Sequence, residues 1–438
     1  MLIAKDAPPV VDRALRRRGL TLALLTLVYF FSYMDRYILA ILLEPIKADL
    51  HLSDTQLGLL SGLAFAIFYA TLGLPVARLA DRSNRRNIIA VALTLWSGMT
   101  AVCGLATNFA QLLLARIGVG VGEAGSGPPS HSIIADLYPP EKRSGAMAIF
   151  SSGVVLGGSA GTIIGGAIAA EHGWRVAIMA IGLPGVLLAV VVRLFVVEPR
   201  RGQSDPGRAA TSDEPMPSAR QAFAAMWRNG PAFHLVMGVT ITSMIGYAVS
   251  SFGPAFLQRT MGLSLKQVAL AVAPMVAVLG TVSGIGGGKL ADWAGKRWGL
   301  HAQCWLVAIL KVFAFPCAIV FYLAPSQGVA IGAYALYLLF ASSYLGPSFA
   351  LIQGLAPIRM RAMWAAVTLL VINLIGLGLG PTLVGVLSDL MQPYVGPQQS
   401  LRYALVIVAA ASPWTIYHYW RAGVLLKREQ ARGEGRGV

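Results

Sequence analysis

Two acidic residues lie deep inside long apolar stretches of this chain, where an ionisable side chain is unusual. They are Asp35 and Glu123, and each has an arginine nearby, Arg36 and Arg116 respectively. A charged group at the centre of a bilayer costs about 2.5 to 3.5 kcal/mol on insertion scales, so such residues face a polar cavity and are functional candidates by default. These four residues are therefore the first place to look for chemistry.

Reversible protonation is the chemistry that this set supports. A carboxyl group that moves between a solvent-facing and an Arg-paired environment changes its proton affinity, so it can load and release a proton. We hypothesise that Asp35 is the main proton carrier and Glu123 a second carrier or relay. Arg36 and Arg116 would modulate both acids or bind an anionic group of a substrate. The alternative is a static buried ion-pair network that holds the two helices together.

Helix geometry places these residues at related depths. Asp35 and Arg116 lie at similar distances from the outer ends of their apolar runs, so they can meet if the two helices are neighbours. Glu123 follows Arg116 by seven residues, which puts it on the same helix face and about 10 Å deeper. Adjacent residues diverge by about 100° around a helix, so Asp35 and Arg36 need not pair with each other.

The elements that position these residues are membrane-spanning helices. Of the 438 residues, 56% are apolar and only 12% are charged, a balance with which a soluble protein could not cover its own surface. A spanning helix needs about 20 apolar residues. We predict an all-α polytopic protein with twelve spans, at residues 20–43, 55–77, 88–107, 109–136, 144–170, 176–197, 231–257, 266–290, 302–323, 329–355, 362–387 and 401–423.

The net charge of +16 records topology rather than a nucleic-acid partner. Most of the 35 Lys and Arg residues fall in segments on the same side as the two termini. Cytoplasmic loops carry such an excess, so we expect both termini in the cytoplasm. We further expect a monomer in the inner (plasma) membrane of a bacterium, in contact with the lipid bilayer and with no nucleic acid bound.

A polar segment divides the spans into two sets of six. Residues 199–230 are rich in Pro, Ser, Arg and acidic residues, which is typical of a flexible linker, here cytoplasmic. The expected organisation is an N-terminal six-helix bundle (1–198), this linker (199–230), a C-terminal six-helix bundle (231–423) and a cytoplasmic tail (424–438).

An internal repeat relates the two halves. The loop ARLADRSNRR (residues 77–86) aligns without a gap with GKLADWAGKR (residues 288–297) at an offset of 211 residues, and a spaced set of glycines, Gly157, Gly161 and Gly166, matches Gly376, Gly380 and Gly385. Two copies of a six-helix unit are typical of transporters whose halves rock about a central site. We expect the loops to act as gates, through Asp81, Arg85 and Arg86 in the first copy and Asp292, Lys296 and Arg297 in the second.

These loops resemble the signature of the major facilitator superfamily, although Ala77 and Asn84 replace the usual glycines of the first copy. Within that superfamily, the stretches SYMDRY (32–37), RIGVGVGEAG (116–125), IIADLYPPEKR (133–143) and HGWR (172–175) are similar to the spinster subfamily of lipid transporters. The resemblance implies two pseudo-symmetric six-helix bundles, alternating access and a lysophospholipid or phosphorylated sphingoid substrate.

The second half is poor in charge and rich in aromatic and hydroxyl side chains. Its spans contain no deep acid and one deep base, Lys311, which we expect a neighbouring helix to satisfy. We predict that Tyr247, Tyr337 and Tyr344 contact the substrate, together with Arg36, Arg116 and Glu123. Ordinary packing accounts for each tyrosine equally well. A charged half facing an aromatic half nevertheless suits an amphiphile with one charged head.

Other functional classes fit less well. The three cysteines and scattered histidines show no metal-binding or redox spacing, and no nucleophile lies beside a base, so we expect no metal, no cofactor and no enzyme activity. Gly120, Gly122 and Gly125 match a dinucleotide fingerprint, but no strand precedes them. A channel or a receptor would not explain why the two loops occur as a matched pair. The nearest rival is a carrier of the same superfamily for small organic anions or sugar phosphates.

Overall fold

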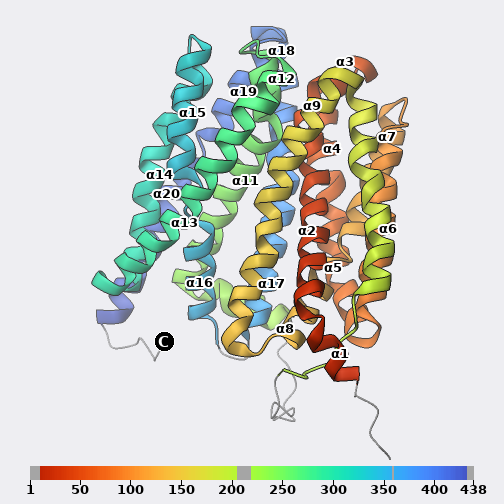
Figure 1. Cartoon of the computed structure of the whole chain (residues 1–438). Helices are drawn as coiled ribbons and strands as arrows, with labels where there is room; N and C mark the ends of the chain where they lie inside the picture. The colour runs from red at the N-terminus through yellow and green to blue at the C-terminus, as the bar shows by residue number, and fades with distance from the viewer. Residues whose placement is uncertain (1–9, 205–218, 358–359, 432–438) are drawn as a thin grey trace, which may run out of the picture. The chain divides into compact units, whose positions relative to one another are not determined.

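The computed structural model of the chain describes residues 10–204, 219–357 and 360–431, and throughout these ranges the regular secondary structure is helical (Figure 1). For a few residues inside helices, only the backbone is described. The helices form two compact units, one of residues Met1–Pro45 and Ile67–Glu214 and the other of Ile46–Ala66 and Pro215–Val438. Each unit is described separately below.

The first unit is built on helix α9, along which both α2 and α6 pack. Its helices are α1 (Val10–Arg16), α2 (Arg18–Ile41), α6 (Arg85–Cys103), α7 (Phe109–Glu123), α8 (Gly127–Leu137) and α9 (Pro140–Phe195), while α3 (Leu43–Leu50) and α5 (Leu63–Arg82) run across its boundaries. Glycine permits the close approach of α9 to α2. A Cβ at Gly157 would lie 2.1 Å from the carbonyl oxygen of Phe30, and one at Gly161 would lie 2.4 Å from that of Met34.

The second unit surrounds α11, which packs against α20, α18 and α16. Its helices are α4 (Asp54–Ser61), α10 (Ala219–Arg228), α11 (Gly230–Arg259), α12 (Leu265–Gln267), α13 (Ala273–Trp298), α14 (Leu300–Leu323), α15 (Gln327–Ala341), α16 (Leu345–Leu355), α17 (Arg361–Val371), α18 (Gly380–Val395), α19 (Ser400–Ala409) and α20 (Ser412–Ala431). Two π-helical segments, η1 (Val268–Val272) and η3 (Ile372–Leu379), interrupt the eighth and eleventh spans. Apolar side chains of α11, α14 and α20 form its core, including Val239, Val307 and Leu426.

All twelve predicted spans are helical. By length and composition, nine helices of the described residues could each cross a membrane. One of the nine, Glu141–Phe195, holds two predicted spans, which separate at the left-handed Gly173 (φ 82°). The fourth span is divided between α7 and α8, and the twelfth between α19 and α20, so neither is one long helix. The predicted all-α fold is thus observed, with breaks that hydropathy alone does not show.

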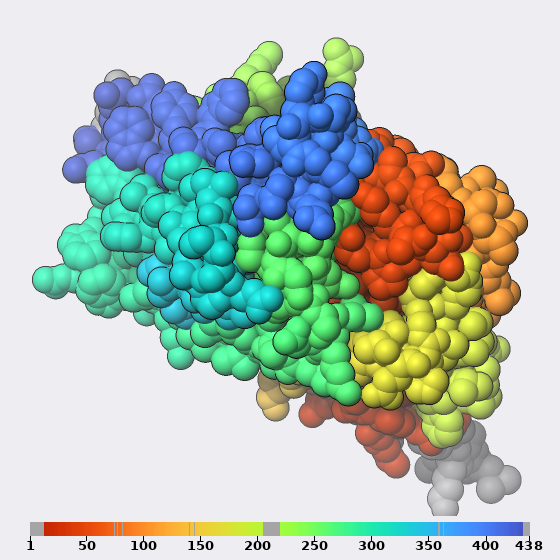
Figure 2. Space-filling model, turned by 90° about the horizontal axis from the view of Figure 1, so that it is seen from above, coloured from red at the N-terminus to blue at the C-terminus, as the bar shows by residue number. Residues whose placement is uncertain are grey.

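The outer part of the second predicted span belongs to the second unit. Helix α4 packs on α18, and Figure 2 shows the red-orange residues of this segment beside the blue ones of α18. Small residues allow the contact, because a Cβ at Gly385 would lie 2.1 Å from the carbonyl oxygen of Asp54, and one at Gly58 would lie 2.6 Å from that of Pro381. Residues 46–66, which the sequence places with the N-terminal half, therefore pack with the C-terminal helices.

Two segments expected to be irregular are partly helical. Within the expected linker, α10 forms because Ala222 and Met226, four residues apart, reach the core of the second unit. The second signature loop, residues 288–297, continues α13 until the chain turns at Gly299, which has a left-handed φ of 95°. The first copy instead turns at Ser83 and Asn84, where the Asn84 side chain accepts a hydrogen bond from the Asn87 N–H.

Candidate transport site

A buried ion pair occupies the interior of the first unit. Arg36, on α2, places one guanidinium nitrogen 2.6 Å from Oε2 of Glu123, at the end of α7, and its Nε donates to the same oxygen at 2.7 Å. The hydroxyl of Ser32 also donates to this oxygen, at 2.8 Å. Glu123 is fully buried, and its other oxygen, Oε1, has no hydrogen-bond partner among the described residues.

Asp35 lies beside this pair. Its side chain is 1% exposed, its Oδ2 accepts a hydrogen bond from the Thr100 hydroxyl at 3.1 Å, and within the described part of the chain its Oδ1 has no donor. Glu123 and Arg116 are both close enough to act on Asp35 electrostatically. Two carboxyls with one unsatisfied oxygen each, in a site shielded from water, form a place where a proton can be held.

Aromatic rings surround the arginine of the pair. The guanidinium carbon of Arg36 lies 4.9 Å from the ring centre of Tyr33 and 4.5 Å from that of Tyr69. Such cation–π contacts stabilise a cation that has left water. The structure thus brings Asp35, Arg36 and Glu123 into one cluster with Arg116, which is 4% exposed, close to it.

The sequence did not indicate the polar partners of these charges. Ser32 and Thr100 hold one oxygen of Glu123 and of Asp35, respectively. Hydroxyl side chains are common in membrane helices and usually bond to their own backbone, so a run of apolar residues with one Ser or Thr gives no signal for such a role.

The three tyrosines predicted for substrate contact have different surroundings. Tyr247 is half-buried and packs against the apolar core of the second unit. Tyr344 shares a hydrogen bond of 3.2 Å with Ser243, and its ring faces the Lys311 ammonium, while Tyr337 lines a small cavity at the same lysine. The helix breaks between α15 and α16, so Tyr337 and Tyr344 do not share one continuous helix.

The first signature segment holds a second buried arginine. Arg85, at the start of α6, is fully buried, forms ion pairs with Asp136 and Glu198, and donates to the carbonyl oxygen of Pro199 at 2.9 Å. The neighbouring Arg86 donates its backbone N–H to Glu198 at 2.9 Å. The segment after α9 also contacts this network, because the Gly202 N–H donates a hydrogen bond to the carboxylate of Asp136. Sequence reasoning missed Glu198, which directly follows the last apolar residues of the sixth span.

The equivalent residues of the second copy are placed differently. The end of α13 exposes the side chains of Asp292, Lys296 and Arg297. Among the described residues, none of these side chains has a hydrogen bond or an ion pair. The side chain of Asp81 lies outside the described residues. The repeat in sequence therefore does not reproduce the Arg85 network in the second unit.

A further charge cluster lies at the α4 end of the second unit, and sequence reasoning missed it. Asp54 is 2% exposed and accepts two bonds of 2.7 Å from Arg259, one of 2.5 Å from Lys47 and one of 2.6 Å from Ser388. The Asp389 carboxylate accepts the N–H groups of Asp54 and Thr55 and so caps α4. A capping box formed by Ser53 and Gln56 marks this helix start in the sequence, but not its partners.

Comparison with known proteins agrees with this architecture. Residues 25–381 match the family model described as Major Facilitator Superfamily. The chain is 35% identical to an MFS-type efflux pump of Mycolicibacterium smegmatis, over 94% of both chains. It is 26% identical to protein spinster homolog 1 of Xenopus tropicalis, over 98% of this chain and 85% of that protein.

Comparison with solved structures also agrees with this architecture. A bacterial homologue of the human lysosomal transporter spinster, in an inward-facing and unoccupied conformation, superposes with a TM-score of 0.84 at 30% identity, covering 95% of this chain and 98% of that one. The nucleoside transporter NupG shares only the fold, with a TM-score of 0.65 at 13% identity. The family resemblance predicted from the signature segments is confirmed. The chain is a multi-pass membrane protein that belongs to the Major Facilitator Superfamily, a spinster-like secondary transporter and not an enzyme.

Proposed function

We propose that this protein is a proton-coupled, alternating-access transporter of an amphiphile with an anionic head, such as a lysophospholipid or a sphingolipid-like molecule. The observation that carries the proposal is the cluster of Asp35, Arg36 and Glu123. Two carboxyls share a dry site with one guanidinium, and each keeps an oxygen that no described residue satisfies.

Competition for Arg36 would couple the proton to the substrate. When Glu123 is ionised, it holds the guanidinium, as observed. When Glu123 takes up a proton, the guanidinium loses its counter-charge and becomes available to a phosphate or carboxylate, which arginine binds well. Asp35 lies beside this pair. A change in the hydration of the Asp35 carboxyl would therefore allow it to exchange a proton with the pair. The positive charge of Arg116 would stabilise whichever of the two carboxyl groups is ionised.

The amphiphile is supported by the contrast between the two units and by the spinster relatives. In the first unit, the Arg36 cluster is the candidate site for the anionic head, and in the second unit Tyr247, Tyr337 and Tyr344 are candidate contacts for an apolar chain. The efflux pump of the mycobacterium supports transport out of the cytoplasm. We place both termini in the cytoplasm, in the inner membrane of a bacterium, because basic residues gather on the side of the termini.

A carrier for small organic anions is the second candidate. The chain is also similar to a hexuronate transporter of Bacillus subtilis, at 26% identity over 68% of this chain. An arginine released from a carboxylate partner would bind a sugar acid as readily as a lipid head.

Transport in liposomes with an imposed pH gradient tests proton coupling. We expect Asp35→Asn and Glu123→Gln each to abolish proton-driven flux while counterflow without a gradient persists. Glu171→Gln, which neutralises an exposed carboxylate of α9, serves as the control and keeps full activity. Undiminished proton-driven flux in both site variants would refute the coupling.

Substrate class is tested separately, by thermal unfolding of the purified protein. We expect lysophospholipid or sphingosine phosphate to raise the unfolding temperature, and Arg36→Met to remove the effect. Stabilisation by hexuronates alone would favour the second candidate instead.

A further inference from the structure

A buried lysine without a counter-charge lies inside the second unit. Lys311, on α14, is 8% exposed. Its Nζ donates to the carbonyl oxygen of Ala341 at 2.5 Å and lies 4.6 Å from the ring centre of Tyr344. Among the described residues, no carboxylate forms an ion pair with it. Neither partner neutralises the ammonium, and a buried charge left uncompensated is strongly unfavourable.

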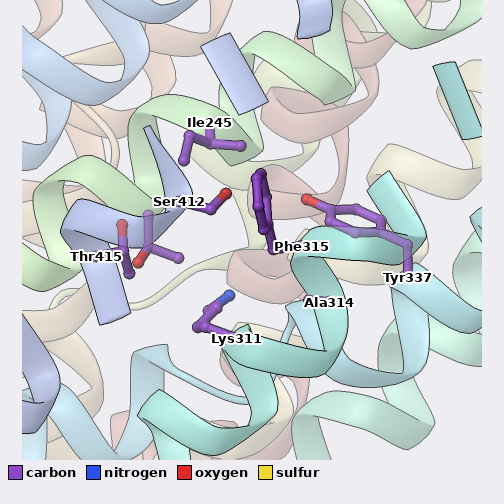
Figure 3. Close-up of a pocket in the computed structure, with 8 residues that line it drawn as sticks. Ile245, Lys311, Ala314, Phe315, Tyr337, Ser412 and Thr415 are labelled. Carbon is purple, nitrogen blue, oxygen red and sulfur yellow. The ribbon is translucent and has the colours of Figure 1, made fainter. Parts of the chain in front are cut away.

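A cavity opens at the end of this lysine. Figure 3 shows Nζ of Lys311 directed into a space bordered by Ser412, Thr415, Phe315 and Tyr337. The ammonium has three N–H groups, of which the Ala341 carbonyl oxygen accepts one. The cavity offers ≈ 20 Å³ to the centre of a water-sized particle, which is room for a small ion but far too little for a lipid.

The wall opposite Lys311 is formed by the start of a helix. The twelfth span breaks after α19, and α20 begins at Ser412. Pro413 favours the break because it lacks the N–H that would continue the helical hydrogen bonds of α19. The dipole of a helix attracts negative charge to its N-terminal end, and α20 has no acidic residue in its first turn, although the N–H groups of Trp414 and Thr415 already donate to the carbonyl oxygen of Ala411. Broken helices of transporters commonly direct such ends at anions.

A side chain of that first turn also lacks a partner. Thr415 is 1% exposed and lines the cavity, and within the described residues its hydroxyl makes no hydrogen bond. A helical threonine normally bonds the carbonyl four residues earlier. The cavity therefore combines a buried ammonium, a helix N-terminus and an unsatisfied hydroxyl, all of which favour the same kind of ligand.

We propose that the cavity between Lys311 and the start of α20 is a binding site for a small anion, such as chloride or a single carboxylate or phosphate group. All residues of this site belong to the second unit and none to the Arg36 cluster, so the proposal does not rest on proton coupling there, although Tyr337 is also a candidate substrate contact. An anion there would compensate Lys311 and fix the broken twelfth span against α14.

Thermal unfolding of the purified protein tests the proposal. Gluconate is replaced by chloride or bromide at constant ionic strength and with the same counter-ion. We expect a saturable rise of the unfolding temperature in the wild type and none in Lys311→Met. Lys427→Met removes an exposed lysine of the same unit and should keep the full response. A wild type without a saturable response, or a Lys311→Met variant that responds equally, would overturn the proposal.

Two further measurements cover the case in which Lys311→Met does not fold. Thr415→Val keeps the shape of the side chain and should weaken chloride binding without loss of fold. In crystals of the wild type grown with bromide, an anomalous peak should lie within hydrogen-bond distance of Nζ, and its absence would overturn the proposal.

Discussion

Two buried cations, Arg36 in the first unit and Lys311 in the second, have opposite surroundings. Arg36 has a carboxylate of its own chain at 2.6 Å, while Lys311 has a carbonyl oxygen, a ring and a cavity. In the first unit, charge is compensated internally and can be regulated by a proton on the acid. In the second unit, the Lys311 ammonium has no carboxylate partner among the described residues, although Asp54 of the same unit is compensated by Arg259 and Lys47. On our proposals, the first cation belongs to a proton-regulated pair and the second binds an anion.

The signature segments show a parallel difference. Arg85 is fully buried between two acids, whereas its equivalent in the repeat, Lys296, is exposed. Sequence symmetry between the halves is therefore not symmetry of interactions. The following predictions test this contrast, beginning with the largest expected effect.

Loss of the acid that pairs with Arg36 should be the most destabilising change. Glu123→Ala leaves a buried guanidinium without its carboxylate, so we expect the free energy of unfolding to fall by about 3 to 5 kcal/mol. The double variant Arg36→Met, Glu123→Met should recover most of that loss. Denaturant titration of the purified protein measures both, and a stable single variant would contradict the ion-pair assignment.

The two signature segments should respond unequally to the same truncation. Arg85→Ala exposes Asp136 and Glu198 to mutual repulsion, and we expect a loss of about 3 kcal/mol. Lys296→Ala changes an exposed side chain and should alter stability by less than about 0.5 kcal/mol. Equal effects in thermal unfolding would show that the two copies are equivalent after all.

Disruption of the cluster around Asp54 should destabilise the protein to an intermediate extent. Asp54→Ala removes the carboxylate shared by Arg259, Lys47 and Ser388, but the Lys47 side chain is 25% exposed and partly solvated. We expect a loss of about 2 kcal/mol, because the hydrated lysine is little affected by loss of its partner. Asp54→Asn, which can still accept hydrogen bonds, should lose less. An Asn variant as unstable as the Ala variant would indicate that charge alone matters.

Alanine substitution should destabilise the protein to different extents at the matched glycines Gly157 and Gly376. Gly157→Ala places a methyl group against a backbone oxygen, so overpacking should cost about 1 to 3 kcal/mol. At Gly376 the nearest atom is the Cβ of Ser243 at 3.1 Å, and a shift of a few tenths of an ångström accommodates the methyl group. Gly376→Ala should therefore have the smaller effect on the unfolding temperature, and the reverse order would contradict the close approach of α9 to α2.

Lys311→Met should be a mild change for a buried position when no small anion is present. The substitution removes a buried charge that has no acid to compensate it, and it nearly preserves side-chain volume, so we expect a change of less than about 1.5 kcal/mol in gluconate buffer. In chloride buffer the variant should fall behind the wild type. A large loss in gluconate would mean that the lysine is compensated by the chain itself.

The sequence predicted the elements well because membrane insertion imposes a strong rule. Every backbone polar group must be satisfied within its own helix, so apolar length alone locates the spans. Breaks inside spans escaped this reasoning. Gly173 and Pro413 are visible in the sequence, but whether a glycine or proline bends, breaks or simply packs depends on the neighbouring helices.

The sequence by itself determined that the chain is a helical membrane protein of this superfamily, and that Asp35, Arg36, Arg116 and Glu123 are its exceptional residues. Only the tertiary structure decided which charge meets which. Arg36 pairs with Glu123, 87 residues away, and Arg85 with Glu198, 113 residues away. The rotation of each helix about its axis selects those partners, and packing of all neighbouring side chains sets that rotation. For the same reason, the sequence alone did not reveal that Lys311 has a cavity in place of an acid.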